Sequence, residues 1–418
     1  MAKKLKILQI NKFFFLKGGS EKYFFDLSDL LVEKGHKVIP WSMEHPQNLF
    51  FPESENFAPY LDFFEKDNFF SRIKNFIRIF WNKKSQLALE EVIKKDNPDV
   101  AHIHNFLTHL SPSIIYTLKK HKIPIVMTLH DYKLFCPNHK FFSKNKTCFD
   151  CLNGSFFTSC IKNKCIHDSL IPSIVGFLEA NWQKYILKIE NKIDYFIAPS
   201  LFIKDKAIEA GVSENKISYI PNFLDKSFQV KNKTISDQLL ENYFLYFGRL
   251  NKEKGIDMLI KTFLDLSKEI PGWKLKIAGE GPKEEKVKTI SRNNKEVEFL
   301  GKKPKRELRD LIKKSYAVII PSLWPENLPY AVLESFALEK PVIASDEGGL
   351  SELINHKENG LLFKPKKINL LENVKWAINN PEKIKRMNRF TQKNLFKKYN
   401  QEKHYKEILK IYERIKNN

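Results

Sequence analysis

Two glutamates that are eight residues apart are the most informative chemical groups in this chain of 418 residues. Glu326 follows Pro325 in a loop, and Glu334 lies in the apolar helical pattern that begins after Pro329. The start of a helix offers unpaired N–H groups and a positive dipole end, so it suits an anionic ligand. Nearby carboxylates can accept hydrogen bonds from hydroxyl groups of that ligand. A phosphorylated sugar carries both kinds of group.

The surrounding sequence resembles family 4 retaining glycosyltransferases, whose signature is two glutamates separated by seven residues. Upstream stands FLYFGRLNKEKGIDMLI, and downstream stand KPVIASDEGGLSELI and NGLLF, in the order of the family. The resemblance extends from Lys6 to about Phe363. It implies the α/β fold called GT-B, with two Rossmann-like doubly wound domains that face each other across a cleft.

The resemblance assigns catalytic roles in the second half of the chain. Arg249 and Lys254 resemble the pair of cations that neutralises the donor diphosphate, where they stabilise the departing charge. Glu334 would bind the ribose hydroxyls, and Glu326 would bind the hydroxyls of the donor sugar. A divalent metal is not expected in catalysis, because these cations supply positive charge and no DxD-type motif ends a strand.

Further donor contacts follow from the same resemblance. Gly279 belongs to the corresponding glycine loop, and Gly301 and Lys302 lie where the family builds its nucleobase pocket. Backbone N–H groups of Leu328 and Tyr330 would supplement the two glutamates.

Two positions depart from the family. Pro329 replaces a common glycine and removes one N–H donor. Phe223 replaces the usual glycine of a turn at the hinge, which puts the geometry of that turn in doubt and leaves Asn222 a weak candidate.

In the first half, a Gly18-Gly19 turn follows the predicted strand over residues 5–10. The glycines permit close approach of a ligand to the backbone, and Ser20 could cap the next helix. The turn resembles the GG-x-E loop of the family, which approaches the donor phosphates and the acceptor. The alternative is an ordinary chain reversal.

Polar residues end the two neighbouring strands. The sequence TLHDY resembles the T-x-H-D motif of the family, which would place His130 beside the transferred sugar and Asp131 at the rim of the cleft. His104 and Asn105 could also line the cleft, or they could be ordinary loop residues.

All five cysteines fall within one window of 30 residues, 136–165. Cys148-x2-Cys151 has the spacing of structural zinc sites, and four thiolates would close a tetrahedral site. Free thiols and an iron–sulfur cluster are the alternatives. A related insertion in a glycosyltransferase subgroup has cysteines at four of these positions, which implies the ligands Cys136, Cys148, Cys151 and Cys165 and leaves Cys160 out.

Short β-rich runs alternate with helical patterns, which predicts parallel sheets built from βαβ units. We expect an N-terminal acceptor-side domain at 1–221, a polar linker at 222–242, and a nucleotide-sugar-binding domain at 243–399. The resemblance implies that the last helix, in residues 400–418, crosses back to the first domain. The predicted strands cover residues 5–10, 36–41, 99–104, 123–130, 194–200 and 217–220, and then 243–249, 275–279, 297–301, 317–322, 341–345 and 360–363.

The net charge of +22 favours phosphate-rich partners. No nucleic-acid-binding signature accompanies it, so an anionic membrane is the favoured partner and nucleic acid is not expected. Residues 69–84 carry apolar and aromatic side chains at helical spacing, flanked by basic residues only, which is typical of an interfacial helix. A helix packed on its own sheet is the alternative. Without a signal peptide or a long apolar run, we expect a cytoplasmic protein, peripheral at the inner face of the plasma membrane.

These patterns predict a retaining, hexosyltransferase-type glycosyltransferase. It would transfer a sugar from a nucleotide diphosphate sugar to a lipid-linked or polysaccharide acceptor in cell-surface glycan biosynthesis. One rival is a sugar-nucleotide epimerase with the same fold, which would form product without an acceptor. The other rival is a basic binding module, which would bind tightly in a salt-sensitive manner and turn over no donor.

Overall fold

The computed structural model describes residues 4–61, 69–152, 155–225, 228, 241–393 and 395–417. The chain divides into two compact units, each with its own parallel sheet. The first unit comprises residues 1–144, 148–221 and 404–418, and the second comprises residues 145–147 and 222–403. Most of the predicted linker, residues 226–227 and 229–240, lies outside the described residues.

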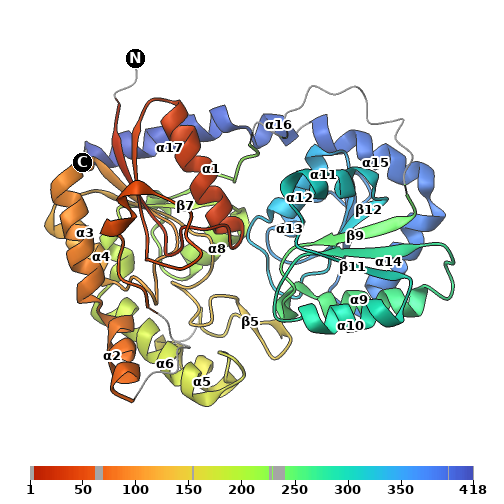
Figure 1. Ribbon diagram of the computed structural model, residues 1–418, viewed down its shortest axis with the longest axis horizontal. Helices are drawn as coiled ribbons and strands as arrows, with labels where there is room; N and C mark the ends of the chain where they lie inside the picture. The colour runs from red at the N-terminus through yellow and green to blue at the C-terminus, as the bar shows by residue number, and fades with distance from the viewer. Residues whose placement is uncertain are drawn as a thin grey trace. The chain divides into compact units, whose positions relative to one another are not determined.

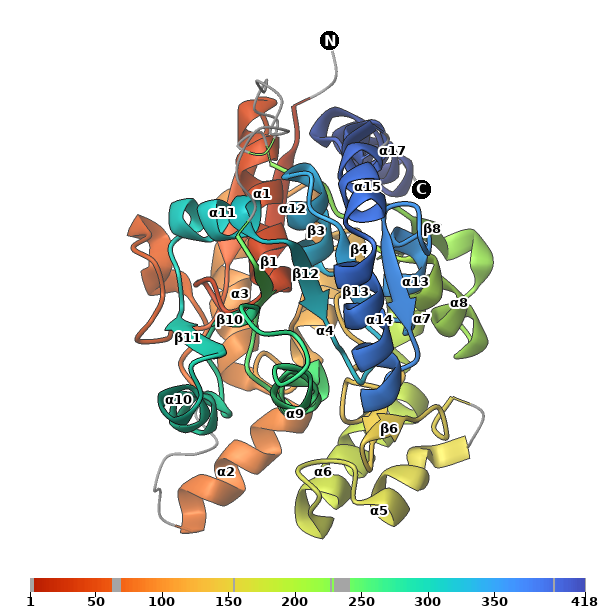
Figure 2. The ribbon, with the colours of Figure 1, turned by 90° about the vertical axis from the view of Figure 1, so that its right-hand side faces the viewer.

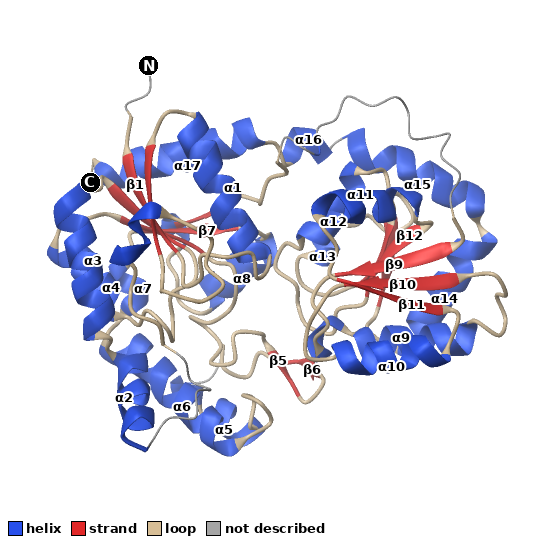
Figure 3. Ribbon diagram, in the orientation of Figure 1, coloured by secondary structure: helices blue, strands red, loops and turns tan. Residues whose placement is uncertain are grey.

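The first unit is built on six parallel strands in the order β2-β1-β3-β4-β7-β8 (Figures 1 and 3). The six predicted strands of this half are confirmed within a few residues at their ends. The strands are β1 (Lys6–Ile10), β2 (Lys37–Trp41), β3 (Val100–Ile103), β4 (Ile125–Thr128), β7 (Tyr195–Ala198) and β8 (Ile217–Tyr219).

Helices connect these strands, and the cysteine-rich segment adds a small hairpin of β5 (Phe142–Ser143) and β6 (Lys146–Thr147). The last helix, α17, packs in the first unit from His404 onward, where Ile408, Ile411, Tyr412 and Ile415 are buried. The helices are α1 (Gly19–Glu33), α2 (Phe69–Phe80), α3 (Lys83–Asp96), α4 (Ser113–Lys120), α5 (Ser159–Asn163), α6 (Leu170–Asn181), α7 (Ile189–Lys192), α8 (Leu201–Glu209) and α17 (Gln401–Lys416).

The second unit repeats the design with the strand order β11-β10-β9-β12-β13-β14, again all parallel (Figure 2). The six predicted strands of this half are also confirmed. The strands are β9 (Tyr243–Phe247), β10 (Lys274–Ala278), β11 (Val297–Gly301), β12 (Ala317–Ile320), β13 (Val342–Ser345) and β14 (Gly360–Phe363).

Helices also connect the strands of the second unit, and α9 packs against α14 beside the sheet. Their apolar side chains and those of the strands form one core, in which Phe244, Ile277 and Ile319 are fully buried. The helices are α9 (Ile256–Leu266), α10 (Glu284–Asn293), α11 (Lys305–Lys314), α12 (Tyr330–Ala337), α13 (Leu350–Leu353), α14 (Lys367–Asn379), α15 (Pro381–Lys393) and α16 (Leu395–Lys398).

The two strand orders reverse at equivalent points, between β1 and β3 in the first unit and between β9 and β12 in the second. At such a switch point the loops at the carboxyl ends of the strands diverge and leave room for a ligand. These two loop clusters are therefore the places to look for function. No helix in the described part of the chain is long and apolar enough to span a membrane.

The expected helix over residues 69–84 is wrong at its C-terminal end. Helix α2 ends at Phe80, and α3 begins at Lys83. Asn82 causes the break, because its side-chain oxygen caps α3 by accepting a hydrogen bond from the Ser85 N–H.

Candidate active site

An ion pair stands at the switch point of the second unit. The Lys254 ammonium, on the loop after β9, donates to both carboxylate oxygens of Glu326, on the loop after β12, at 2.7 and 2.9 Å. Glu326 is only 4% exposed. The structure thus brings together two side chains that were predicted to bind different parts of the donor.

The Glu326 carboxylate still has room for another donor. Its Oε1 also accepts from the Ser322 hydroxyl at 2.5 Å and from the Trp324 indole N–H at 2.9 Å, whereas Lys254 is the one donor to Oε2 among the described residues. A carboxylate offers about four lone-pair positions. Because three donors crowd Oε1, the remaining lone-pair position is at Oε2.

Glycines lock the surrounding loops together. A Cβ on Gly279 would meet the Gly248 carbonyl oxygen at 1.9 Å, and one on Gly349 would meet the Asn327 oxygen at 1.6 Å. Backbone hydrogen bonds join the same loops, from Gly248 N to Ala278 O at 3.0 Å and from Gly349 N to Glu326 O at 2.7 Å. The loop after β9 is therefore tied to the loop after β10, and the loop after β12, which carries Glu326, is tied to the loop after β13.

Helix α12 begins beside these loops and lacks a side-chain cap. Pro329 is its N-cap residue, and the Val332 N–H bonds back to the Pro329 carbonyl at 3.1 Å. The N–H groups of the first turn, including that of Tyr330, point out of the N-terminal end of the helix. This end favours anions. Glu334 lies one turn further along and is partly exposed.

Asn222 supports the loop before this helix by donating from Nδ2 to the Leu328 carbonyl at 3.3 Å. The doubt about Phe223 is resolved by its backbone. Phe223 is fully buried and is not among the described residues with positive φ, so the position does not require glycine.

The remaining predicted donor residues lie at the ends of β9, β10 and β11. Arg249 is exposed, and the structure gives its guanidinium no ion pair among the described residues. Gly301 has φ 67° with open space where a Cβ would be. Lys302 forms an exposed ion pair with Glu280 at 2.6 Å. Arg249 and Lys302 can therefore reach a ligand without disturbing the core.

In the first unit, α1 starts at Gly19 with Gly18 as its N-cap residue. The expected capping by Ser20 is wrong, because the helix begins before Ser20 and no side chain caps it. Glu21, in the first turn, is 3% exposed and receives a long hydrogen bond from Asn11 Nδ2 at 3.5 Å. Among the described residues, the start of α1 thus lacks a side-chain cap at the carboxyl end of β1.

His130 is half-buried and ends a chain of polar rings beside this turn. Its Nε2 lies 2.9 Å from His104 Nδ1, and His104 Nε2 lies 2.5 Å from Gln9 Oε1. Tyr23, on α1, packs edge-on against the His130 ring and bonds to His404 of α17 at 2.9 Å. Burial lowers the pKa of His130 to about 3 and lowers the pKa of His104 well below its usual value, so both rings are neutral at pH 7.

The other two predicted rim residues have structural partners. Asp131 accepts a hydrogen bond from the Lys133 N–H at 2.9 Å, and the Asn105 N–H donates to Asn11 Oδ1 at 3.1 Å. They hold the loops in place and do not themselves point to a ligand.

Three of the cysteine thiols crowd Cys151. Burial is the main cause of its raised pKa, followed by the thiols of Cys136, Cys165 and Cys148. Cys151 therefore lies within electrostatic range of the three other predicted metal ligands. Their chemistry suits zinc, but no three His, Cys, Asp or Glu side chains in the described ranges are arranged to hold a metal ion.

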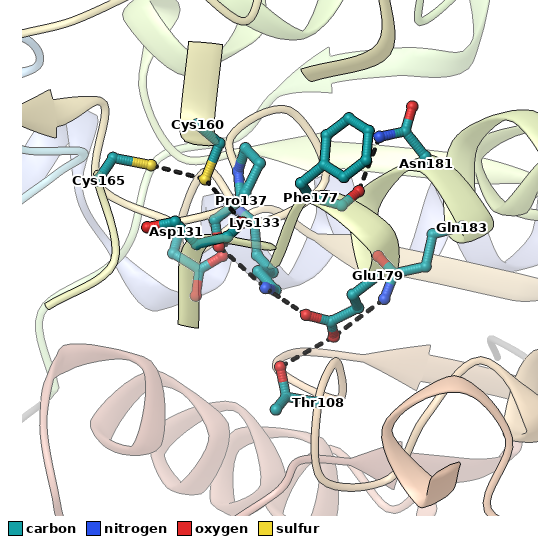
Figure 4. Close-up of polar contacts among 11 residues, drawn as sticks. Thr108, Asp131, Lys133, Pro137, Cys160, Cys165, Phe177, Glu179, Asn181 and Gln183 are labelled. Atoms are coloured by element: carbon teal, nitrogen blue, oxygen red, sulfur yellow. Dashed lines mark hydrogen bonds and ion pairs between the residues drawn. The ribbon is translucent and has the colours of Figure 1, made fainter. Parts of the chain in front are cut away.

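Cys160, which was left out of the predicted set, is next to it. Its Sγ lies 2.7 Å from that of Cys165 (Figure 4). Cys136 donates instead to Asn138 Oδ1 at 2.9 Å. Zinc binding stays a prediction, and no step of the proposed reaction depends on it.

Sequence reasoning missed Ser322, Trp324 and Gln9, which hold Glu326 and His104. Single polar residues such as these give no signal in one sequence. His102 was also missed, although a signal existed. His102 and His104 are two apart on a strand and therefore share one face, where their rings stack with centroids 4.6 Å apart.

Comparisons with known proteins identify both halves of the chain. The family model described as Glycosyltransferase Family 4 matches residues 17–228, and the model described as Glycosyl transferases group 1 matches residues 230–394. An uncharacterised 42.6 kDa protein in the cps region of Klebsiella pneumoniae is 28% identical over 347 residues, covering 80% of this chain and 83% of the relative.

Solved structures show the same fold. Sucrose-phosphate synthase from Thermosynechococcus elongatus has a TM-score of 0.71 at 18% identity, over 99% of both chains. HepE from Anabaena, in complex with UDP and glucose, has a TM-score of 0.64 at 17% identity, over 97% of this chain and 99% of that one. With two Rossmann-like domains, the architecture is GT-B. The chain is a glycosyltransferase and belongs to glycosyltransferase family 4.

Proposed function

We propose that this glycosyltransferase is a retaining enzyme that uses a nucleotide diphosphate sugar as donor. Its acceptor is a lipid-linked saccharide or a growing polysaccharide of the cell surface, and its place is the inner face of the plasma membrane. The observation that carries the proposal is the Lys254–Glu326 pair, with both oxygens within 2.9 Å of the ammonium, beside the uncapped start of α12. Anion-binding and hydroxyl-binding groups are thus adjacent.

Different residues of the second unit bind different parts of the donor. Arg249 and Lys254 stabilise the negative charge that grows on the leaving diphosphate, and the positive end of the α12 dipole adds to that field. Glu334 accepts from the ribose hydroxyls. The free position at Glu326 Oε2 accepts from a hydroxyl of the donor sugar, and the glycine-locked loops hold that carboxylate in place before the donor arrives.

The reaction then needs no nucleophile from the protein. The acceptor hydroxyl attacks the anomeric carbon on the face from which the diphosphate departs, so the configuration is retained. The bond to the diphosphate oxygen breaks, and that oxygen takes the acceptor proton. The neutral His130 ring, at the carboxyl end of β4 in the first unit, offers one hydrogen-bond acceptor to a sugar hydroxyl.

The relatives support the donor class and the pathway. HepE was solved with UDP and glucose, and the Klebsiella relative is a protein in a cps region. The test starts with thermal unfolding in the presence of different nucleotide diphosphate sugars, because a ligand of the native state raises the melting temperature. The bound donor is then incubated with candidate acceptors, and NMR of the product reports the anomeric configuration. An inverted product refutes retention, and donor conversion without an acceptor indicates an epimerase.

A further inference from the structure

Helix α6 has an inverted distribution of side chains. The residues that it buries are small or polar, namely Ser173, Gly176, Glu179 and Ala180. Large aliphatic side chains lie on its exposed side, where Ile171 is 74% exposed. A helix that covers a protein core in water has the opposite arrangement. The exposed aliphatic residues of α6 are Leu170, Ile171, Ile174 and Leu178.

The buried face of α6 is fully engaged, which fixes the orientation of the helix (Figure 4). Glu179 accepts from Lys133 at 2.7 Å, from Thr108 at 3.0 Å and from Gln183 at 3.1 Å. At Gly176 a Cβ would lie 2.3 Å from Ile166 Cδ1, so a larger residue there would have to displace the Ile166 side chain. Rotating the helix would break the buried ion pair and these contacts. The apolar face therefore cannot turn inward.

Neighbouring elements extend this apolar surface. The π-helical turn Trp182–Ile186 continues α6 and leaves Ile186 63% exposed. The Trp182 ring contacts Phe80 of α2 edge-on, with ring centroids 6.4 Å apart. On α2, Ile77 is 57% exposed and Phe76 is also exposed. Both views of the ribbon place α2, α5 and α6 at the same end of the first unit (Figures 1 and 2).

The charge around this surface is positive. Residues 74–85 contain no acid, and in residues 155–192 Asp168 is the one acidic side chain that is exposed, because Glu179 is buried and Glu190 is mostly covered. Asp150, which accepts a hydrogen bond from Asn163 of α5, is a second exposed acid. Basic side chains, by contrast, stay in solvent. The exposed lysines of these elements are Lys74, Lys83, Lys84, Lys162, Lys164 and Lys188.

We infer that the exposed apolar face of α6, together with α2, docks on an anionic lipid bilayer. Aliphatic side chains would enter the interface, and the lysines around them would contact the headgroups. A second copy of the chain fits less well, because a symmetric contact would bring two like-charged surfaces together. The inference does not depend on the transferase reaction. Residues 69–84 were predicted to contact a membrane, and we now assign the principal contact to α6.

Vesicle sedimentation tests this inference. The full chain is mixed with vesicles of phosphatidylcholine alone or with phosphatidylglycerol added, and the bound fraction is measured over a range of salt concentrations. Three variants are compared with the natural chain. Ile171→Ser/Leu178→Ser removes apolar area from α6, Lys83→Gln/Lys84→Gln removes charge, and Val32→Ser/Ile368→Ser removes equally exposed apolar side chains elsewhere.

We expect the natural chain to bind the anionic vesicles preferentially. The α6 variant should lose affinity by about tenfold or more, because it no longer buries two large aliphatic side chains in the bilayer. The lysine variant should bind less at low salt, and the Val32/Ile368 control should bind as the natural chain does. Equal binding by the α6 variant, or no binding by the natural chain, would overturn the inference. So would a dimer, in sedimentation without vesicles, that the α6 substitutions dissociate.

Discussion

The imidazole of His104 accepts a hydrogen bond from the imidazole of His130, with 2.9 Å between Nδ1 and Nε2. The assignment follows from Gln9, whose Oε1 can only accept and lies 2.5 Å from His104 Nε2. His104 therefore carries its proton on Nε2, and its Nδ1 must accept from His130. The neutral His130 then presents an unprotonated Nδ1. Gln9 is separated from His130 by two hydrogen bonds, and it thereby determines the tautomer of this candidate catalytic histidine.

Replacing Gln9 should test this relay. Gln9→Leu removes the acceptor that fixes His104, so His130 loses its preferred tautomer. We expect kcat to fall about tenfold or more, because proton transfer depends on which ring nitrogen of His130 carries the proton. The Kd of the donor should change little. Imidazole nitrogen NMR shifts of His130 should change in parallel. Gln9→Asn, which keeps an amide, should recover part of the rate, and unchanged NMR shifts in Gln9→Leu would contradict the relay.

The buried histidines should also make the first unit sensitive to acid. Burial lowers the pKa to about 3 for His109 and about 4 for His404, and in both cases desolvation is the largest cause. In the unfolded chain these histidines have a pKa near 6.5. Below that pH the unfolded chain therefore binds protons that the native state does not bind. Stability is therefore full above pH 6.5 and falls as the pH drops toward 4. The pKa is lowered in the same direction for His36, His102, His104 and His130.

Each such histidine contributes up to about 1.4 kcal/mol per pH unit to the loss. Urea unfolding at pH 7 and pH 5, followed by a probe in the first unit, measures the total. His404→Gln should reduce the pH dependence by about one histidine's share, whatever it does to stability at pH 7. An unchanged dependence would show that His404 is protonated in the native state.

The sequence predicted the fold well, because both sheets are buried and parallel, and such strands appear as short apolar runs between helical patterns. Gly279, which was assigned to a donor loop, lies where close backbone packing allows no Cβ, and its contact with the donor stays a prediction. The sequence did not predict that Lys254 pairs with Glu326, because these residues are 72 positions apart and no local pattern links them. The sequence also did not predict that α6 exposes its aliphatic side chains. Apolar residues occur on several sides of this helix, so the pattern does not indicate which side is buried.

The donor site in the second unit can be tested by paired substitutions of neighbouring cations. Arg249→Ala should lower kcat more than it weakens donor binding, because leaving-group charge is greatest in the transition state. Lys252, an exposed lysine three residues away, is the matched control, and Lys252→Ala should keep the rate. Equal rate losses in both variants would indicate a general effect of positive charge and would remove Arg249 from the site.

Glu334 should act on binding more than on rate. Glu334→Gln removes the charge of a partly exposed carboxylate while keeping its volume, so the melting temperature should stay nearly the same. The Kd of the donor, measured by calorimetry, should rise about tenfold, in line with a hydrogen bond between a charged group and ribose hydroxyls. Unchanged donor affinity would show that Glu334 faces solvent in the complex.

The cysteine cluster gives the last prediction, which concerns folding and not the transfer reaction. If Cys136, Cys148, Cys151 and Cys165 bind a structural ion, protein prepared under reducing conditions should contain about one zinc per chain. Cys148→Ser should lose the metal and destabilise the first unit, because metal-binding energy in such loops is also folding energy. Cys160→Ser is the critical control, since its thiol lies 2.7 Å from that of Cys165 and yet lies outside the predicted set. Retention of zinc in Cys160→Ser would support the predicted four ligands, its loss would place Cys160 among them, and protein without zinc or iron together with full stability of Cys148→Ser would identify all five as thiols.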